Sequence, residues 1–426
     1  MTKNQALDFI ERENIKWNNF HYDITNGHNH FKYVTQYPSS RTPPITVIDS
    51  TGKIVFSDIF DNRTFEVENY FISLLENDFN NVVTEKYTSK DYSKDGEVII
   101  LQEASIGNGI DIVMLGDAYS DRQIIDGSYK NDMVYLYNHL FTEEPFNSFK
   151  EYFNVYYINV VSQNEGYEPF NETAFSSYFG NSLRVGGNDA KVFEYAQKAI
   201  SAERMDNAVL IVAMNSDNDA GTCWMYTPSG YSDYGNGVSV SYFSRGGYAE
   251  TFAQLLHHEA CGHGFAKLAD EYAYEGTEIP SDDVSQIIQE QNDWGWWKNV
   301  DFTSDASQVR WKHFLNDSRY QYEGLGAFEG GLTYWSGVWR PTENSIMRYN
   351  TGGFNAPSRE AIYYRIHKLA YGDEWEYDYE EFVEWDAKNR KTEASATRAP
   401  YRIEKPKEFK PTAPPVVINK NWRDVK

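Results

Sequence analysis

The chain has 426 residues, with 39 Lys and Arg against 63 Asp and Glu, so its formal net charge is −24. This excess of negative charge argues against a nucleic acid partner and against an anionic membrane surface. Only Cys223 and Cys261 are present, which excludes a disulfide framework and leaves open whether these two pair. At roughly 150 residues per domain, the length predicts two or three domains.

The chain shows no membrane span. Its start, MTKNQ, lacks the apolar stretch of a signal peptide, and no run of about 18 apolar residues follows. The protein is therefore either cytoplasmic or exported with its signal removed. We expect the second, with an extracellular, periplasmic or cell-surface location.

From about residue 17 to residue 98, short runs alternate polar and apolar residues. The runs ITVID (45–49) and KIVF (53–56) are joined by the turn-forming sequence DSTG (49–52). Alternation of this kind predicts β-hairpins. We assign residues 1–98 to a small β-rich accessory domain, for which a purely structural role is at least as good an explanation as ligand binding.

After a charged stretch at 90–96, longer apolar runs alternate with helix-like segments. The runs at 110–117, 155–161 and 208–213 have the pattern of buried strands. Strands that alternate with helices predict a sheet with helices packed on it. We therefore expect a second domain at 99–385.

From residue 386 onward, charge and proline content rise together. This composition predicts that residues 386–426 form an extended tail along the surface and not a domain.

The segment 248–274 contains no proline, which favours a helix. Apolar residues recur in it at spacings that a helix gathers on one side, namely Phe252, Leu255, Leu256, Phe265 and Leu268. The same segment carries His258, Glu259 and His263. A hydrolytic zinc site needs neutral imidazoles and a carboxylate beside the water that the metal binds. Three of the parts of such a site are therefore present.

The two histidines stand one residue further apart than in the HExxH motif, where residues i and i+4 share one metal ion. In a regular α-helix, i+4 leaves two side chains ~40° apart around the axis, whereas i+5 separates them by ~140°. Gly262 precedes the second histidine, and a π-type widening can absorb one extra residue. We predict such a widening around Cys261 and Gly262. The pairing of His257 with His263 leaves no Glu in the right relation to the first ligand and is disfavoured.

A His-His-Glu cluster in a helix can also be a hydrogen-bonded polar patch without a metal. Two later segments favour the metal site. The sequence LADEY (268–272) supplies carboxylates where a chain turning away from the helix can bring back a third ligand. The sequence NSIMRY (344–349) places Met347 in a short turn, with Tyr349 two residues later.

The sequences HEACGHGFAKLADEY (258–272), ENSIMRYN (343–350) and FNAPSREAIYYRI (354–366) together resemble the IgA peptidase family. This is the sixty-fourth metallopeptidase family, which is grouped with the metzincin-like zincins. The resemblance starts near Gly107, where GNGIDIVMLGDAYS (107–120) is similar to the first strand of that domain, and it extends to about Ile366. It implies an α+β fold: a zincin-like catalytic domain, with a mixed sheet over an active-site helix, preceded by a small N-terminal β-sandwich.

The resemblance also implies roles for individual residues. His258 and His263 would bind one catalytic Zn²⁺, Glu259 would be the general base, and Met347 would form the floor of the site. Asp270 is expected to be the third ligand, with Glu271 or His313 as alternatives. Tyr349 resembles the tyrosine that stabilises the oxyanion in some metzincins, although aromatic packing explains it as well.

The expected function is zinc-dependent hydrolysis of peptide bonds by a metal-activated water. The expected partner is a protein or peptide substrate, glycoproteins included. A catalytically inactive zincin fold that binds peptides or glycans is the alternative, and the extra residue between the histidines motivates it. A glycosidase that uses a pair of carboxylates ranks last, because no such pair stands out.

Overall fold

The computed structural model describes residues 87–425 apart from 169–170, 181–183, 248 and 394–410, together with the backbone of four strands in the first 60 residues. Contacts divide the chain into two compact units, Met1–Lys86 and Tyr87–Lys426. The boundary that we placed at 98/99 falls at the start of β5 (Val98–Gln102), a strand of the second unit.

The first unit contains two antiparallel strand pairs. One joins β1 (Asn19–Asp23) to β2 (His30–Val34), and the other joins β3 (Pro44–Ile48) to β4 (Ile54–Ile59). The second pair is the hairpin predicted from the sequence around 45–56, with Val47 opposite Phe56. Two strand pairs do not establish a sandwich, so the N-terminal β-sandwich stays a prediction.

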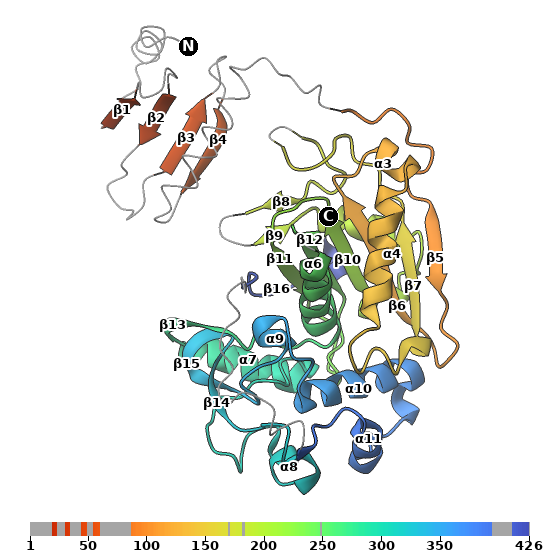
Figure 1. The fold of residues 1–426 in the computed structure, drawn as a ribbon, viewed down its shortest axis with the longest axis vertical. Coiled ribbons are helices and arrows are strands. Elements are labelled where there is room, and N and C mark those ends of the chain that lie inside the picture. The colour runs from red at the N-terminus through yellow and green to blue at the C-terminus, as the bar shows by residue number, and fades with distance from the viewer. Residues whose placement is uncertain are drawn as a thin grey trace. The chain divides into compact units, whose positions relative to one another are not determined.

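The second unit is built on a mixed sheet of seven strands in the order β16-β11-β12-β10-β6-β7-β5 (Figure 1). The contacts β7–β6, β6–β10, β10–β12 and β11–β16 are parallel, whereas β5–β7 and β11–β12 are antiparallel. The strands other than β5 are β6 (Ile110–Asp117), β7 (Phe153–Ile158), β10 (Val209–Met214), β11 (Gly221–Tyr226), β12 (Ser239–Ser244) and β16 (Val416–Ile418). The buried strands predicted at 110–117, 155–161 and 208–213 are confirmed as β6, β7 and β10.

Both faces of this sheet are covered, which explains why its central strands are apolar along their whole length. On β6, Ile112 and Met114 belong to one hydrophobic cluster, whereas Val113 and Leu115 belong to another. Alternate side chains therefore supply cores on opposite faces, as the pleat requires. The first cluster also contains residues of α4, α6 and α10, and the second contains residues of α5.

The helices of the second unit are α3 (Asp121–Ile125), α4 (Ser128–Leu140), α5 (Asp189–Ala196), α6 (Ala249–Leu255), α7 (Ser281–Trp294), α8 (Lys312–Leu315), α9 (Ile346–Tyr349), α10 (Ala356–Tyr371) and α11 (Tyr379–Asp386). Short 3-10 turns occur at Lys150–Tyr152, Arg204–Asn207, Ser318–Tyr320, Gly372–Glu374 and Trp422–Asp424. A three-stranded sheet in the order β13-β15-β14 consists of β13 (Ala273–Glu278), β15 (Thr333–Arg340) and β14 (Phe328–Gly331), and a two-stranded ribbon joins β8 (Tyr178–Phe179) to β9 (Val185–Gly186).

The structure also bears on the two cysteines and on the question of a membrane span. Cys223 and Cys261 are both free and buried. Within the described residues, no helix combines the length and the apolar character that a membrane crossing demands.

Candidate metal centre

The histidine segment forms a π-helix, η4 (Leu256–Phe265), that directly continues α6. The widening predicted around Cys261 and Gly262 is confirmed, and it extends over ten residues instead of one turn. A π-helix has about 4.4 residues per turn, so two side chains at i and i+5 return to within roughly 50° of each other. His258 and His263 therefore project from the same side.

Neighbouring elements stabilise this unusual helix. The hydroxyls of Ser239 and Ser241 on β12 donate to the carbonyls of Gly264 and Glu259, each over 3.0 Å. Close packing also requires small residues: a Cβ on Gly262 would lie 2.2 Å from Sδ of Met347. The extra residue is thus accommodated by side-chain hydrogen bonds from the sheet and by a glycine beside the methionine.

The helix ends earlier than the segment 248–274 suggested. After Phe265 the chain turns at Lys267, whose φ of +55° is in the left-handed region. The carbonyl of Lys267 accepts from the backbone N–H of Trp297 over 2.8 Å, which fixes the turn. The chain then runs back past the helix and places Asp270 opposite the two histidines.

Three ligand atoms converge on one point. Nε2 of His258 lies 3.0 Å from Oδ1 of Asp270, and Nε2 of His263 lies 3.2 Å from the same oxygen. The two Nε2 atoms are 3.1 Å apart. Ligand atoms 2.0 to 2.1 Å from a tetrahedral zinc ion are roughly 3.3 Å from one another, so the spacing fits such an ion.

The outer nitrogens of the two imidazoles fix which atoms face the centre. Nδ1 of His258 donates to the carbonyl of Ile346 over 3.1 Å, and Nδ1 of His263 donates to the carbonyl of Leu268 over 2.7 Å. A carbonyl can only accept, so in the neutral rings the Nε2 lone pairs point inward. Two such nitrogens and a carboxylate oxygen in a buried space form a donor set that suits zinc.

The electrostatics of the centre favour a bound positive charge. Burial alone lowers the pKa of His258, but the hydrogen bond and the charge of Asp270 outweigh it and raise that pKa to about 9. The pKa of Asp270 is lowered, because the two histidines outweigh the effect of its burial. Without a metal, a proton on His258 is what balances the carboxylate.

Glu259 follows the first histidine on η4 and is fully buried. Burial raises the pKa of its carboxyl group above the ordinary value. Apart from a weak interaction with the side chain of Thr412, neither carboxyl oxygen has a hydrogen-bond partner among the described residues. A buried carboxyl group with a raised pKa and unused acceptor capacity is suited to taking up a proton.

The model of the family described as IgA Peptidase M64 matches residues 99–320, just over half of the chain. The chain belongs to this family. The match contains η4 and Asp270 but ends before Met347. No curated protein matches the chain. Among solved structures, a crystal structure of metalloproteinase-II from Bacteroides fragilis is similar at 11% identity over 66% of this chain and 94% of that chain, with a TM-score of 0.21, which is too low to bear on fold or function.

The alternative third ligands of this M64 family member have other partners. Glu271 accepts hydrogen bonds from Asn299, Ser345 and Asn355, at 2.7 to 3.2 Å. Its backbone N–H also donates to the carbonyl of Met347 over 2.8 Å. Glu271 therefore connects two segments of the centre: the turn at 344–349 that carries Met347, which we call the methionine turn, and the segment after Lys267 that carries Asp270. His313 pairs instead with Glu360 over 3.0 Å.

The two remaining candidates also face other groups. His257 turns its Nε2 to the carbonyl of His139, 2.7 Å away. Tyr349 is the last residue of α9, and its ring lies under the guanidinium of Arg348, 4.5 Å from the ring centre. The oxyanion role of Tyr349 stays a prediction.

The structure adds Tyr272, which sequence reasoning did not select. Its ring centre is 6.5 Å from that of His258, and its hydroxyl donates to the carbonyl of Thr412 over 2.8 Å. Burial, followed by the charge of Asp270, raises the pKa of Tyr272 well above its ordinary value, so the hydroxyl keeps its proton. In the sequence, only its place two residues after Asp270 indicated that Tyr272 lies near the site. That spacing does not reveal in which direction the side chain of Tyr272 points.

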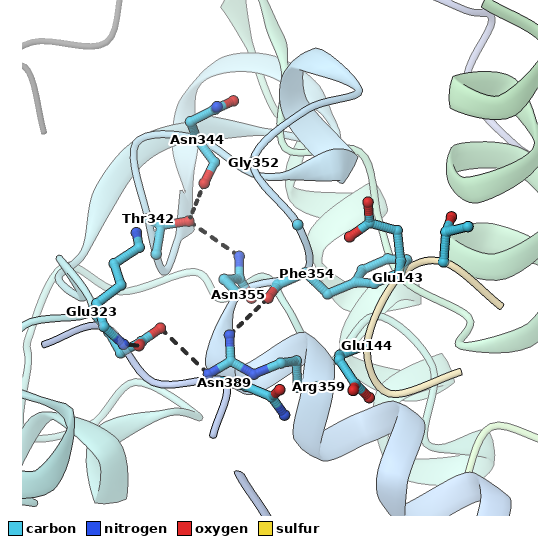
Figure 2. Close-up of a pocket in the computed structure, with 13 residues that line it drawn as sticks. Glu143, Glu144, Glu323, Thr342, Asn344, Gly352, Phe354, Asn355, Arg359 and Asn389 are labelled. Carbon is cyan, nitrogen blue, oxygen red and sulfur yellow. Dashed lines mark hydrogen bonds and ion pairs between the residues drawn. The ribbon is translucent and has the colours of Figure 1, made fainter. Parts of the chain in front are cut away.

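A pocket of about 260 Å³ lies elsewhere, beside the segment that follows the methionine turn (Figure 2). Arg359 bridges Glu323 and the carbonyl of Phe354 at its wall. Neither the three ligands nor Glu259 line this pocket. The pocket is therefore separate from the metal centre.

Proposed function

We propose that this M64 family member is a zinc-dependent endopeptidase. The observation that carries the proposal is the convergence of His258, His263 and Asp270 with Glu259 next in sequence to the first ligand. These three residues would hold the ion. When bound, zinc supplies a Lewis acid that polarises a peptide carbonyl and makes water more acidic.

The chain's own groups would handle the proton. Glu259 would accept the proton of the attacking water and return it to the nitrogen of the leaving amine. Its buried position supports this role, because a carboxylate in an apolar environment is a stronger base than one in water. Ile346 and Leu268 would keep the imidazoles oriented through their carbonyls. Tyr349 remains the proposed donor to the oxyanion.

The alternative of an inactive binding protein was motivated by the extra residue between the histidines. The π-helix weakens that motive, because it returns His263 to the side of His258. We further propose a protein substrate, glycoproteins included, and a location outside the cytoplasm. The net charge of −24 supports a partner that is not a polyanion.

The substitution Glu259→Gln tests the proposal. We expect zinc content to remain stoichiometric while peptide hydrolysis falls by about a hundredfold to ten-thousandfold, the usual contribution of a general base. Glu250→Gln is the matched control, because Glu250 is exposed on the preceding helix α6. Full hydrolysis by the Glu259 variant would overturn the assignment of the base, and a native chain that binds no zinc would overturn the proposed enzyme.

A further inference from the structure

The candidate centre is shut off from solvent, although a peptidase must admit a polypeptide to it. His258 and Asp270 are 1% exposed, and Glu259 and His263 are not exposed. Residues 411–425, which we call the C-terminal segment, form part of the cover over the metal centre.

The start of this segment lies beside Glu259. The backbone N–H of Ala413 donates to the carbonyl of Gly221 over 3.3 Å, and Tyr272 holds the carbonyl of Thr412. Gly221 is close to Glu259, since a Cβ on it would lie 2.8 Å from Oε1 of that residue. Thr412 is also near enough to influence the pKa of Glu259. Thr412 and Ala413 are themselves buried.

The segment then continues along the outer edge of β11. Trp224, Met225 and Tyr226 pair in parallel with residues 416–418, which form β16. Without β16, β11 would be the last strand of the sheet. The edge of a sheet offers unpaired N–H and C=O groups, and an extended peptide can bind there as an added strand.

We propose that residues 411–418 occupy the polypeptide-binding edge of this peptidase and keep its metal centre closed until they are displaced. The inference rests on the proposed function. The hydrogen bond from Tyr272 to a peptide carbonyl supports it, because the hydroxyl that donates to Thr412 would donate to a carbonyl of the arriving substrate once the segment leaves.

The cover is built to be displaced. Pro411, Pro414 and Pro415 have no N–H to donate, so this stretch can form few hydrogen bonds with β11. The hydroxyl of Thr412 and the carboxyl group of Glu259 are buried next to each other but form no hydrogen bond of good geometry. A weak contact between buried polar groups does not compensate for the bonds to water that they lose, so it weakens the closed state.

The far end of the segment supplies the anchor. Trp422 packs on Phe193 of α5, and its Nε1 donates to Asp206 over 2.7 Å. Arg423 forms an ion pair with the same carboxylate. Trp422 and Phe193 belong to the second hydrophobic cluster, on the face of the sheet opposite η4, so their contact can be weakened without touching the metal ligands.

The test uses the full-length, zinc-loaded protein with Trp422→Ala, and with Val417→Asp as a second variant because Val417 packs against a separate hydrophobic cluster. We expect the kcat/KM for a fluorogenic peptide to rise by about tenfold to a hundredfold, as when a minor open state becomes the major one. Dipicolinate should also remove zinc faster from both variants. Lys420→Ala, at an exposed position of the same segment, should change neither quantity.

Hydrogen exchange at the amides of Gly221–Tyr226 reports whether the segment has left β11. If exchange increases in both variants while hydrolysis and zinc removal keep their original rates, the closure is refuted. If zinc removal accelerates but neither the original chain nor the variants cleave any peptide, the peptidase function fails and the closure stands.

Discussion

Sδ of Met347 lies where a side chain on Gly262 would begin, since a Cβ there would be 2.2 Å away. The methionine turn and the π-helix therefore fit each other only because residue 262 has no side chain. The same turn holds His258 through the carbonyl of Ile346. The position of His258, the first proposed ligand, thus depends on the packing of Met347 against Gly262.

Substituting Gly262→Ala should destabilise the fold by about 1 to 3 kcal/mol, the usual cost of overpacking a core. It should also weaken zinc binding, because the methionine turn must move. Urea unfolding and zinc titration measure the two effects. The double variant Gly262→Ala/Met347→Ala should lose less stability than the sum of the single variants, since the smaller side chain makes room. Additive losses would show that the two residues do not interact.

Glu271 should stabilise the fold and not bind the metal. Glu271→Ala leaves buried donors from Asn299, Ser345 and Asn355 without their acceptor, so we expect a loss of at least about 1 to 3 kcal/mol in unfolding free energy. Glu271→Gln keeps the shape and part of the hydrogen bonding and should lose less. Glu275→Gln, at an exposed position, is the control. Loss of zinc from a folded Gln variant would make Glu271 a ligand after all.

Zinc affinity should increase with pH up to about 9. Below that pH the metal-free His258 carries a proton, because its pKa is raised to about 9, and zinc must displace this proton to bind. The pKa of Asp270 is lowered, so that residue adds no proton to the balance at neutral pH. We expect the apparent Kd to fall by about tenfold per pH unit between about pH 7 and pH 9. The dependence should flatten in Asp270→Asn, whose His258 loses its carboxylate partner; an unchanged slope there would be evidence against this pairing.

Removing Cys261 restores the spacing of HExxH, with the histidines at i and i+4. A regular α-helix then places both imidazoles on one side, so we expect zinc affinity to stay within about tenfold of the original value. Inserting an alanine between Ala260 and Cys261 is the matched opposite change, and it should abolish binding because the histidines move further out of register. Zinc titration of the two folded variants tests this expectation. Equal affinities would show that the spacing between His258 and His263 does not affect zinc binding.

The sequence by itself predicted a metal-dependent chemistry, and it also predicted the helix widening that the extra residue between the histidines requires. The residue types at 258, 259 and 263 predict a zinc site, and Gly262 next to one extra residue predicts a π-type widening, because both arguments depend only on neighbours along the chain. The apolar runs of β6, β7 and β10 were equally readable, since strands buried on both faces need apolar residues throughout.

Only the tertiary structure decided the choices that depend on distant contacts. Asp270 and Glu271 are adjacent carboxylates, and the turn at Lys267 together with the donors from Asn299, Ser345 and Asn355 separates their positions. The C-terminal segment reaches β11 from almost 200 residues away, and its composition predicts an extended chain but not the edge that it covers. The pairing of strands far apart in sequence depends on which strand edges are still unpaired when the remainder of the domain has folded. A local sequence pattern does not contain this information.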